Sequence, residues 1–375
     1  MIKKLPVVAA LLLSFPAEAQ TSHGAGLPKT VRVLATGGTI AGSGQSSSGA
    51  YRAGVVPIAD ILRTVPGLSD IANISSEQVA NVGSNDIDET VWLKLLRRVQ
   101  AAVSDPGVSG VIITHGTDTL EESAYFLSLV MPSTKPVVLV GSMRPGTTVG
   151  ADGPQNLLDA ARVASSDEAR DRGVLVVMND TIFDPKSVTK VDVRHVNAFA
   201  APSRGAIGEV LTAQPTFFTR ANPHGAEFAV TTATLPRVGV AYAYVGITKD
   251  DILAAARGKS GLIIAGEGAG DFSASAREAV RELTNKGIPV VRVARQGVGD
   301  VWFNEPSVGP MSDVGLGTVA GRGLTPPKAR ILLMLALQEP ERRHASHRHV
   351  PPKKGVVVGR NGCTKGETRW PAEPY

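Results

Sequence analysis

The stretch ATGGTIAGSG at residues 35–44 follows a short, largely apolar run at residues 31–35. An apolar, β-branched run of this kind predicts a strand that is buried on both faces of a sheet. Glycine and hydroxyl residues at the end of such a strand allow backbone and side-chain oxygens to approach a small polar ligand closely. The stretch therefore predicts a ligand-binding turn at the carboxyl end of a buried strand.

Apolar runs alternate with amphipathic segments from this point to about residue 204, which predicts strand and helix units in a parallel sheet. The expected strands of this part are residues 31–35, 111–114, 136–141 and 174–178. Helix start signals stand between them. Asp88 precedes an amphipathic run, and Thr119 with Glu122 and Asp152 with Gln155 each predict a capping box.

The alternation fails at residues 219–236, which are polar and contain two prolines, and it restarts afterwards. Strands are expected at residues 238–242, 262–265 and 289–293, with helices that begin near Thr248, Ser273 and Pro326. A chain of 375 residues is long for a single domain. We therefore expect a catalytic N-terminal α/β domain at 28–218, a linker at 219–236 and a C-terminal α/β domain at 237–340.

Both ends of the chain differ from this body. Residues 1–19 contain Lys3 and Lys4, a short apolar stretch and the sequence Ala-Glu-Ala, which predicts a signal peptide cleaved before Gln20. The apolar stretch is shorter than the roughly 20 residues of a membrane span, so we expect a periplasmic or secreted protein without a membrane partner. Residues 341–375 lack any helical or strand period, which predicts a basic, disordered tail; a basic surface-binding tail and an out-of-frame end are the alternatives.

The net charge of +5 is concentrated in this tail, which carries eight Lys or Arg and three Asp or Glu. The rest of the mature chain is close to neutral, which argues against nucleic acid as a partner. The seven histidines are scattered, three of them in the tail, and the lone cysteine, Cys363, lies there too. The sequence therefore predicts no metal centre and no internal disulfide.

Polar loops at residues 36–39, 115–118 and 141–144 follow three of the expected strands, and a fourth polar loop at 83–86 follows the segment 77–82. The carboxyl ends of parallel strands meet at one edge of a sheet, and ligands bind in the crevice outside that edge. The four loops together therefore predict a small pocket of hydrogen-bond donors and acceptors.

Two threonines in these loops are candidate nucleophiles, because a hydroxyl can attack when a base removes its proton and donors stabilise the oxyanion. They are Thr39, among glycines, and Thr117, beside Asp118 at a helix start; Lys190 is the nearest amine that could activate them. Each has a simpler interpretation: a phosphate or dinucleotide cradle, a helix cap and a solvated lysine, respectively. The stretch lacks the Gly-x-Gly-x-x-Gly spacing of dinucleotide sites, which weakens the cofactor interpretation.

The pair ATGGTIAG at 35–42 and ITHGTDTLEESAYFL at 113–127 resembles the bacterial L-asparaginase family, most closely its secreted, type II branch. The resemblance continues through VGSMRP, ADGPQNL, RGVLVVMND and VTK to LTPPKARILLMLAL and covers roughly residues 28–338. It implies an α/β fold of two unequal domains: a larger N-terminal domain with a flavodoxin-like parallel sheet, and a smaller, Rossmann-like C-terminal domain. It also implies a homotetramer built as a dimer of dimers, and no cofactor.

For the reaction, the resemblance implies that Thr39 attacks the side-chain amide, that ammonia leaves, and that water hydrolyses the acyl-enzyme. Tyr51 would close over the substrate on a lid whose hinge is residues 42–49. Thr117, Asp118 and Lys190 would form a second triad.

For substrate binding, the resemblance implies that Asp118 holds the α-ammonium group, while Ser84 and backbone amides hold the α-carboxylate. Asn85 stands where the family commonly has glutamine, and Asp271 stands where the neighbouring subunit commonly presents asparagine. A glutamate that usually precedes the last helix has no clear counterpart, and Glu305 and Asp313 are the acids near its place.

These departures leave the reaction in place and bear on the choice between substrates, since one methylene is worth about 1 to 3 kcal/mol of discrimination. The expected activity is hydrolysis of L-asparagine to L-aspartate and ammonia, with L-glutamine as a weaker substrate. A periplasmic amino-acid binding protein without turnover is the alternative from another class. An amidotransferase relative that acts on transfer RNA shares the threonine motifs, and the leader and the near-neutral body argue against it.

Overall fold

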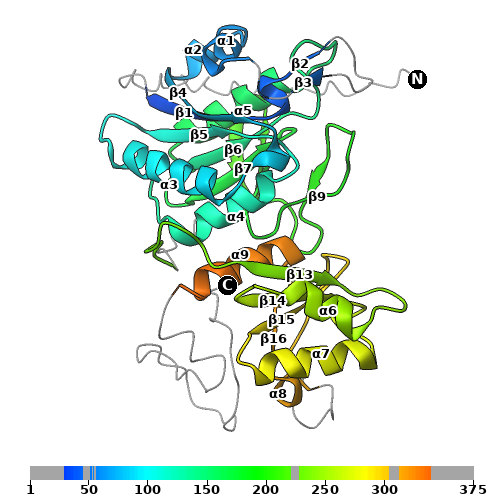
Figure 1. Ribbon diagram of the computed structural model, residues 1–375. Coiled ribbons are helices and arrows are strands. Elements are labelled where there is room, and N and C mark those ends of the chain that lie inside the picture. The colour runs from blue at the N-terminus through cyan, green and yellow to red at the C-terminus, as the bar shows by residue number, and fades with distance from the viewer. Residues whose placement is uncertain are drawn as a thin grey trace, which may run out of the picture.

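The computed structural model describes residues 29–44, 51–52, 54, 56–220, 228–303 and 312–338. These residues form an α/β protein with a large sheet in one part and a small sheet in the other, each accompanied by helices (Figure 1). The predicted leader at 1–19 and the predicted tail at 341–375 lie outside the described residues.

The large sheet has eight strands in the order β12-β11-β8-β7-β6-β5-β1-β4. They are β1 (Thr30–Gly37), β4 (Asn73–Val82), β5 (Gly110–Thr114), β6 (Val137–Val140), β7 (Val174–Met178), β8 (Thr181–Phe183), β11 (Gly208–Leu211) and β12 (Gln214–Phe217). Strands β4, β1, β5, β6 and β7 are parallel, whereas β8, β11 and β12 continue the sheet as antiparallel neighbours. The predicted parallel sheet is thus present, and an antiparallel edge makes the whole sheet mixed.

Two tight turns explain the antiparallel edge. Asn179 and Asp180 both have positive φ, and so do Thr212 and Ala213. Two consecutive residues of that conformation make the turn that joins adjacent antiparallel strands. Strand β7 therefore folds back into β8, and β11 into β12, without a crossover helix.

Helices and short elements complete the N-terminal part. The helices are α1 (Ile58–Arg63), α2 (Leu68–Ile71), α3 (Glu89–Ser104), α4 (Leu120–Val130) and α5 (Gly153–Ser165), with single 3-10 turns η1 (Thr39–Ala41) and η2 (Ser84–Asp86). Two small antiparallel pairs lie outside the sheet: β2 (Ser43–Gly44) with β3 (Tyr51–Arg52), and β9 (Thr189–Lys190) with β10 (Phe199–Ala200). Asp88 caps α3 as predicted, because its carboxylate accepts a hydrogen bond from the backbone of Val91.

The small sheet has four parallel strands in the order β13-β14-β15-β16. Its strands are β13 (Val238–Tyr242), β14 (Gly261–Gly266), β15 (Val290–Ala294) and β16 (Thr318–Ala320), and its helices are α6 (Lys249–Ala256), α7 (Ala274–Asn285), α8 (Asp313–Leu316) and α9 (Pro326–Ala336). Thr248 and Ser273 cap α6 and α7, as their sequence signals predict.

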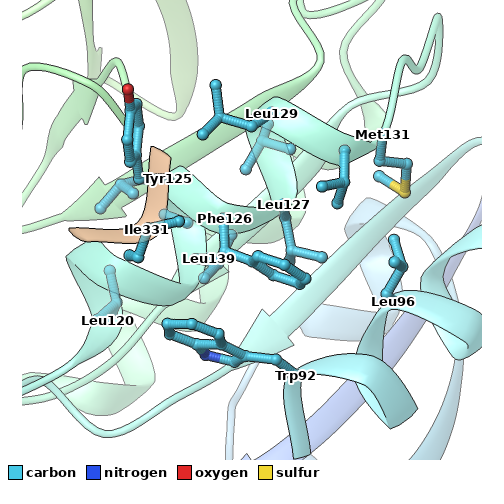
Figure 2. Close-up of a cluster of buried hydrophobic side chains, with 14 of the residues drawn as sticks. Trp92, Leu96, Leu120, Tyr125, Phe126, Leu127, Leu129, Met131, Leu139 and Ile331 are labelled. Atoms are coloured by element: carbon cyan, nitrogen blue, oxygen red, sulfur yellow. The ribbon is translucent and has the colours of Figure 1, made fainter. Parts of the chain in front are cut away.

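One hydrophobic core is continuous between the two sheets. It contains side chains of α3, α4 and β5 from the N-terminal part and of β14, β15 and α9 from the C-terminal part. Helix α9 lies at the junction, between α4 and the small sheet (Figure 1). Within this core the Trp92 ring stacks on Phe126, with ring centroids 4.9 Å apart, and Ile331 of α9 lies beside α4 (Figure 2). The last helix is therefore part of the support for the N-terminal sheet.

Candidate active site

The order of the parallel strands indicates where a ligand should bind. Strands β4-β1-β5-β6-β7 follow the flavodoxin-like order, in which the strand order reverses between the first and third strands along the chain. Here these strands are β1 and β5, and their register pairs Ala35 with Thr114. Because ligands bind at this switch point, the turns that follow β1 and β5 are the candidate site.

Glycines bring these turns into backbone contact. A Cβ atom at Gly38, whose φ is +81°, would lie 2.3 Å from the Cα of Gly116. A Cβ atom at Gly116 would lie 2.7 Å from the Cβ of Ser84. Any side chain at these glycines would push the turns apart. The glycines therefore set the separation of Thr39 and Thr117, each of which directly follows one of them.

Four polar side chains meet next to this contact. The Lys190 Nζ donates hydrogen bonds to the Thr117 Oγ1, at 2.8 Å, and to the Asp118 Oδ1, at 2.6 Å. The Ser84 Oγ donates to the Asp118 Oδ2 at 3.2 Å and accepts from the Asp118 backbone N–H at 3.3 Å. The structure thus brings together Ser84, Thr117, Asp118 and Lys190 from three separate segments.

The charge state of Asp118 suits the binding of a cation. The hydrogen bond from Lys190 lowers the pKa of the Asp118 carboxyl, with further lowering by the Lys190 charge and by Ser84, while partial burial acts in the opposite direction. The Asp118 side chain is 64% exposed, whereas that of Lys190 is 15% exposed. The carboxylate is therefore ionised and open to a ligand, while the ammonium group is directed inward.

The short strand β9 delivers Lys190 to this cluster, 72 residues along the chain from Asp118. Its partner strand β10 pairs Phe199 with Lys190. The backbone N–H of Lys190 donates to the Glu121 Oε2 at 2.6 Å, which ties β9 to helix α4. Glu121 is itself buried, so this contact fixes the backbone from which the lysine side chain extends.

The sequence also predicts Thr39, Tyr51 and Asn85 for the site, and these residues lie in the short elements η1, β3 and η2. Thr39 is 8% exposed and begins the turn η1. The backbone of Tyr51 pairs with Gly44 in the β2–β3 pair, and residues 45–50 of the predicted hinge lie outside the described residues. Asn85 is exposed in η2, and its side-chain oxygen lies 2.7 Å from where a Cβ of Gly83 would be.

Asp271 does not belong to this cluster within one chain. It is exposed in the C-terminal part, in a turn after β14 where its backbone pairs with Glu267. Asp313 is 1% exposed, and both of its carboxylate oxygens accept hydrogen bonds from the Arg292 guanidinium. Asp313 therefore cannot replace a substrate-binding glutamate, and Glu305 lies outside the described residues.

Two predicted helix caps hold loops of the site instead. The Thr119 hydroxyl makes no capping bond to α4 and donates to the Ser84 carbonyl at 2.7 Å. The Asp152 carboxylate makes no capping bond to α5 and accepts from the backbone amides of Met143 and Arg144, at 2.8 and 2.9 Å. The two capping-box predictions were therefore wrong, although both helices begin where the signals stand. The Thr119 hydroxyl and the Asp152 carboxylate bond to backbone groups of neighbouring loops instead of to the helix N-termini.

A buried histidine that the sequence analysis did not single out supports Gly116. The His115 Nδ1 donates to the Gly116 carbonyl at 2.7 Å, and its Nε2 accepts from the Ser123 hydroxyl at 2.8 Å. Ser123 in turn accepts from the Trp92 Nε1 at 2.7 Å. Complete burial lowers the pKa of His115 to about 4, so the ring is neutral and this chain of donors is satisfied. Only the buried position of His115 identifies its role, and the motif alone does not reveal it.

The described residues hold neither a metal-binding cluster nor a membrane-crossing helix. In residues 29–44, 51–52, 54, 56–220, 228–303 and 312–338, no group of three or more His, Cys, Asp or Glu side chains could hold a metal ion. Over the same part of the chain, no helix combines the length and the apolar character that crossing a membrane requires.

Two family models match the chain, and its similar relatives include an L-asparaginase and a glutaminase-asparaginase. Residues 30–223 match the family described as "Asparaginase, N-terminal", and residues 237–349 match "Glutaminase/Asparaginase C-terminal domain". The chain is 42% identical over 315 residues to L-asparaginase 2 of Bacillus subtilis (strain 168), covering 82% of each protein. It is 40% identical over 342 residues to the glutaminase-asparaginase of Pseudomonas fluorescens biotype A, covering 89% of this chain and 93% of the relative.

A solved structure agrees with these relatives. The crystal structure of a probable cytoplasmic L-asparaginase from Campylobacter jejuni matches with a TM-score of 0.76 at 35% sequence identity. The match covers 85% of this chain and 98% of that one.

Proposed function

The chain belongs to the asparaginase family, and from that premise we propose that Thr39 forms the acyl-enzyme through which it hydrolyses L-asparagine. The protein is an amidohydrolase of the L-asparaginase and glutaminase-asparaginase kind. The observation that carries the proposed mechanism is the Thr117–Asp118–Lys190 cluster beside the Gly38–Gly116 contact. It supplies a hydroxyl, a carboxylate and an amine at the switch point of the sheet.

In the proposed first step, the Thr39 Oγ attacks the side-chain amide carbon of asparagine, and the tetrahedral intermediate collapses with loss of ammonia. The Thr39 proton passes to the leaving nitrogen, and the product is a β-aspartyl ester of Thr39. In the second step, water attacks this ester, and aspartate and the free threonine hydroxyl are formed. The loops around Thr39 supply backbone N–H groups that stabilise an oxyanion in both steps.

Thr117 has a distinct role in this proposal. Its oxygen accepts a hydrogen bond from the Lys190 ammonium, so its own proton must point elsewhere. We assign this hydroxyl to the substrate side, where it and Lys190 relay protons and polarise the reacting groups. Tyr51 closes over the bound substrate from the β2–β3 segment.

The α-ammonium and α-carboxylate groups of the substrate each have a partner of suitable chemistry in the site. Asp118 binds the α-ammonium group, because its carboxylate is ionised and largely exposed. Ser84 and neighbouring backbone amides bind the α-carboxylate. Asn85, one methylene shorter than glutamine, contacts the same head group; one methylene is worth about 1 to 3 kcal/mol of discrimination, so we propose L-glutamine as a weaker second substrate.

The assembly that we propose is a homotetramer built as a dimer of dimers. Apolar side chains are exposed at the carboxyl ends of β13 and β15, namely Tyr242, Tyr244, Val245, Val298 and Trp302. Isolated exposed apolar residues are common, but a group at one sheet edge is typical of an interface. Asp271 follows β14 at the same edge, and a second copy bound there would bring it near the site of its neighbour.

We also propose export to the periplasm or the medium, supported by the leader sequence of residues 1–19. Fractionation of cells that express the full chain tests this. Mature protein that begins at Gln20 outside the cytoplasm is expected, and uncleaved protein in the cytoplasm would contradict it.

The test of the proposed activity is ammonia release by purified mature protein from asparagine and, separately, from glutamine. Ammonia is expected from both, at a higher kcat/KM for asparagine, and Thr39→Ala should remove both activities. Tight, stoichiometric binding of asparagine without turnover would instead support an amino-acid binding protein. Full activity of Thr39→Ala would refute the proposed nucleophile.

A further inference from the structure

A fully buried lysine of the C-terminal part reaches into the N-terminal part. Lys328 lies in the first turn of α9 and is 0% exposed. Its Nζ donates to the carbonyl of Lys186 at 3.1 Å and also to the carbonyl of Val188. A buried ammonium group is unfavourable unless hydrogen bonds and opposite charges compensate it. The two carbonyls, 142 and 140 residues away along the chain, supply part of this compensation for Lys328.

The carbonyls that Lys328 binds belong to the segment that leads into β9. Val188 is 0% exposed and precedes the strand that carries Lys190. On the other side, the Lys190 backbone N–H is bound by Glu121 of α4. The backbone that presents the Lys190 side chain is thus tied to α9 before the strand and to α4 within it.

The two helices that provide these ties form one packed unit. Helix α4 contacts helix α9, and Leu120 and Tyr125 of α4 and Ile331 of α9 belong to the same buried core (Figure 2). The Lys328 Nζ also lies 6.0 Å from the centroid of the Tyr125 ring. A position that is fixed by two helices packed on each other cannot shift independently of the sheet.

Three carboxylates near Lys328 favour its charged form. Glu121 and Glu122 of α4 and Asp184, in the connection before β9, act on it in the direction of the charged form. Burial outweighs them and lowers the pKa of Lys328 to about 8, so the group is charged in neutral solution. Arg330, two residues further along α9, acts on Glu122 and pairs with Glu89.

We propose that Lys328 is a positioning residue, which holds residues 186–188 so that the Lys190 ammonium meets Thr117 and Asp118 at hydrogen-bond distance. Lys328 touches no substrate in this account and acts through Lys190. The inference rests on the proposed amidohydrolase mechanism, in which Lys190 takes part. It gives the C-terminal part a role in catalysis within its own chain.

The test compares Lys328→Met with wild type in the ammonia assay, together with a matched variant of the same helix. Arg330→Met removes a partly exposed contact with Glu89 and serves as the control. For Lys328→Met we expect kcat to fall by about tenfold or more, because a displacement of a few tenths of an ångström weakens both Lys190 contacts. We expect KM to change by less than about threefold. Arg330→Met should retain wild-type kcat.

A pH profile separates positioning from a general loss of stability. The hydrogen bond from Lys190 lowers the pKa of Asp118, so a displaced Lys190 should move the acid limb of kcat/KM to higher pH. The double variant Lys190→Met/Lys328→Met should be no slower than Lys190→Met alone, because both changes remove the same interaction. Additive losses and an unmoved acid limb would overturn the proposal.

Folding of each variant is measured by thermal unfolding, and Lys328→Gln, which retains N–H donors, provides a second variant. It should show an intermediate kcat and an intermediate acid limb. If neither Lys328 variant folds, the lysine is a structural residue and the proposal is wrong. If wild type releases no ammonia, the proposed function fails and this inference with it; if wild type is active and Lys328→Met matches it, only the inference fails.

Discussion

The two sheets of the molecule end differently at their carboxyl edges. At the large sheet, glycine contacts and hydrogen bonds gather Ser84, Thr117, Asp118 and Lys190 into one polar cluster. At the small sheet, apolar side chains are left exposed after β13 and β15, and within that sheet the buried Arg292 binds Asp313 and the carbonyls of Ala269 and Trp302. We propose that the same strand–helix architecture supports chemistry at the large sheet and subunit contact at the small one.

The small sheet also shows how a buried charge can serve a purely structural purpose. Arg292 is 1% exposed, and its guanidinium N–H groups donate to Asp313 and to loop carbonyls. These N–H groups are therefore not directed at a ligand. Lys190 instead directs its donors at a hydroxyl and at a largely exposed carboxylate. The two buried or partly buried cations therefore differ in the exposure of their acceptors, which supports our proposal that the catalytic site lies at the large sheet.

The largest expected effect distinguishes the two sheets by the same substitution. Thr117→Val removes the hydroxyl that Lys190 contacts and should lower kcat/KM for asparagine by about 10³-fold, as expected for loss of a proton-transfer group. Thr318→Val removes a buried hydroxyl that donates to Asp313 at 2.6 Å at the small sheet. It should reduce thermal stability and leave kcat/KM within about threefold of wild type. Equal losses of activity in the ammonia assay would contradict the proposed distinction between the two sheets.

The second expected effect concerns the buried support of the polar cluster. The pKa of His115 is lowered to about 4 from 6.5 by burial, so the unfolded chain binds more protons between these values. Stability should therefore fall as the pH drops from about 6.5 toward 4, by roughly 3 kcal/mol for this group. Urea unfolding measured at several pH values should show this loss in wild type and a smaller one in His115→Asn.

The exposed His195 offers a control for that measurement. It pairs with Asp192 on the β9–β10 segment, and its side chain is 75% exposed. His195→Asn should leave most of the acid-induced loss in place. If it removed the loss and His115→Asn did not, the assignment of the buried histidine would be wrong.

A third prediction tests the backbone contact that sets the cluster. Gly38→Ala would place a Cβ 2.3 Å from the Gly116 Cα, so the turns must separate, and kcat/KM should fall by about 10²-fold. Gly258 has a similar positive φ of +68°, and nothing lies within 4 Å of its Cβ position. Gly258→Ala should therefore introduce only backbone strain, about 1 to 2 kcal/mol of stability, and leave kcat/KM unchanged. Undiminished activity of Gly38→Ala would show that the separation of the turns does not matter.

The smallest expected effect is at the small sheet. Val245 is 97% exposed beside the other apolar residues of that edge, and Val245→Asp should weaken self-association by about tenfold in sedimentation experiments at micromolar protein. Leu211 is 53% exposed at the turn between β11 and β12, on the far edge of the large sheet. Leu211→Asp should leave association unchanged. A reversed result would move the interface to the other end of the molecule.

Much of this arrangement could be predicted from the sequence. The runs at 111–114 and 174–178 form β5 and β7, because continuous apolar sequence suits strands that are buried on both faces. The loops after β1, β4 and β5 converge because the ends of parallel strands must meet at one edge. These features depend on local pattern and on the general geometry of parallel sheets.

Other features depend on contacts that no local pattern encodes. The antiparallel strands β8 and β12 are too short to show a period, and the turn at Thr212 and Ala213 uses residues that rarely take positive φ. Thr119 has the signal of a helix cap, but its hydroxyl binds Ser84 of another loop. Lys328 resembles a surface lysine in a helical sequence and becomes buried only because α9 packs on α4.

Identification of the covalent intermediate tests most directly whether Thr39 is the nucleophile. Purified protein is mixed with excess asparagine, quenched in acid within the first turnovers, digested and analysed by mass spectrometry. We expect a β-aspartyl adduct on the peptide that contains Thr39, absent from Thr39→Ala and from samples without substrate. An adduct on a different residue, or rapid ammonia release from Thr39→Ala, would contradict it.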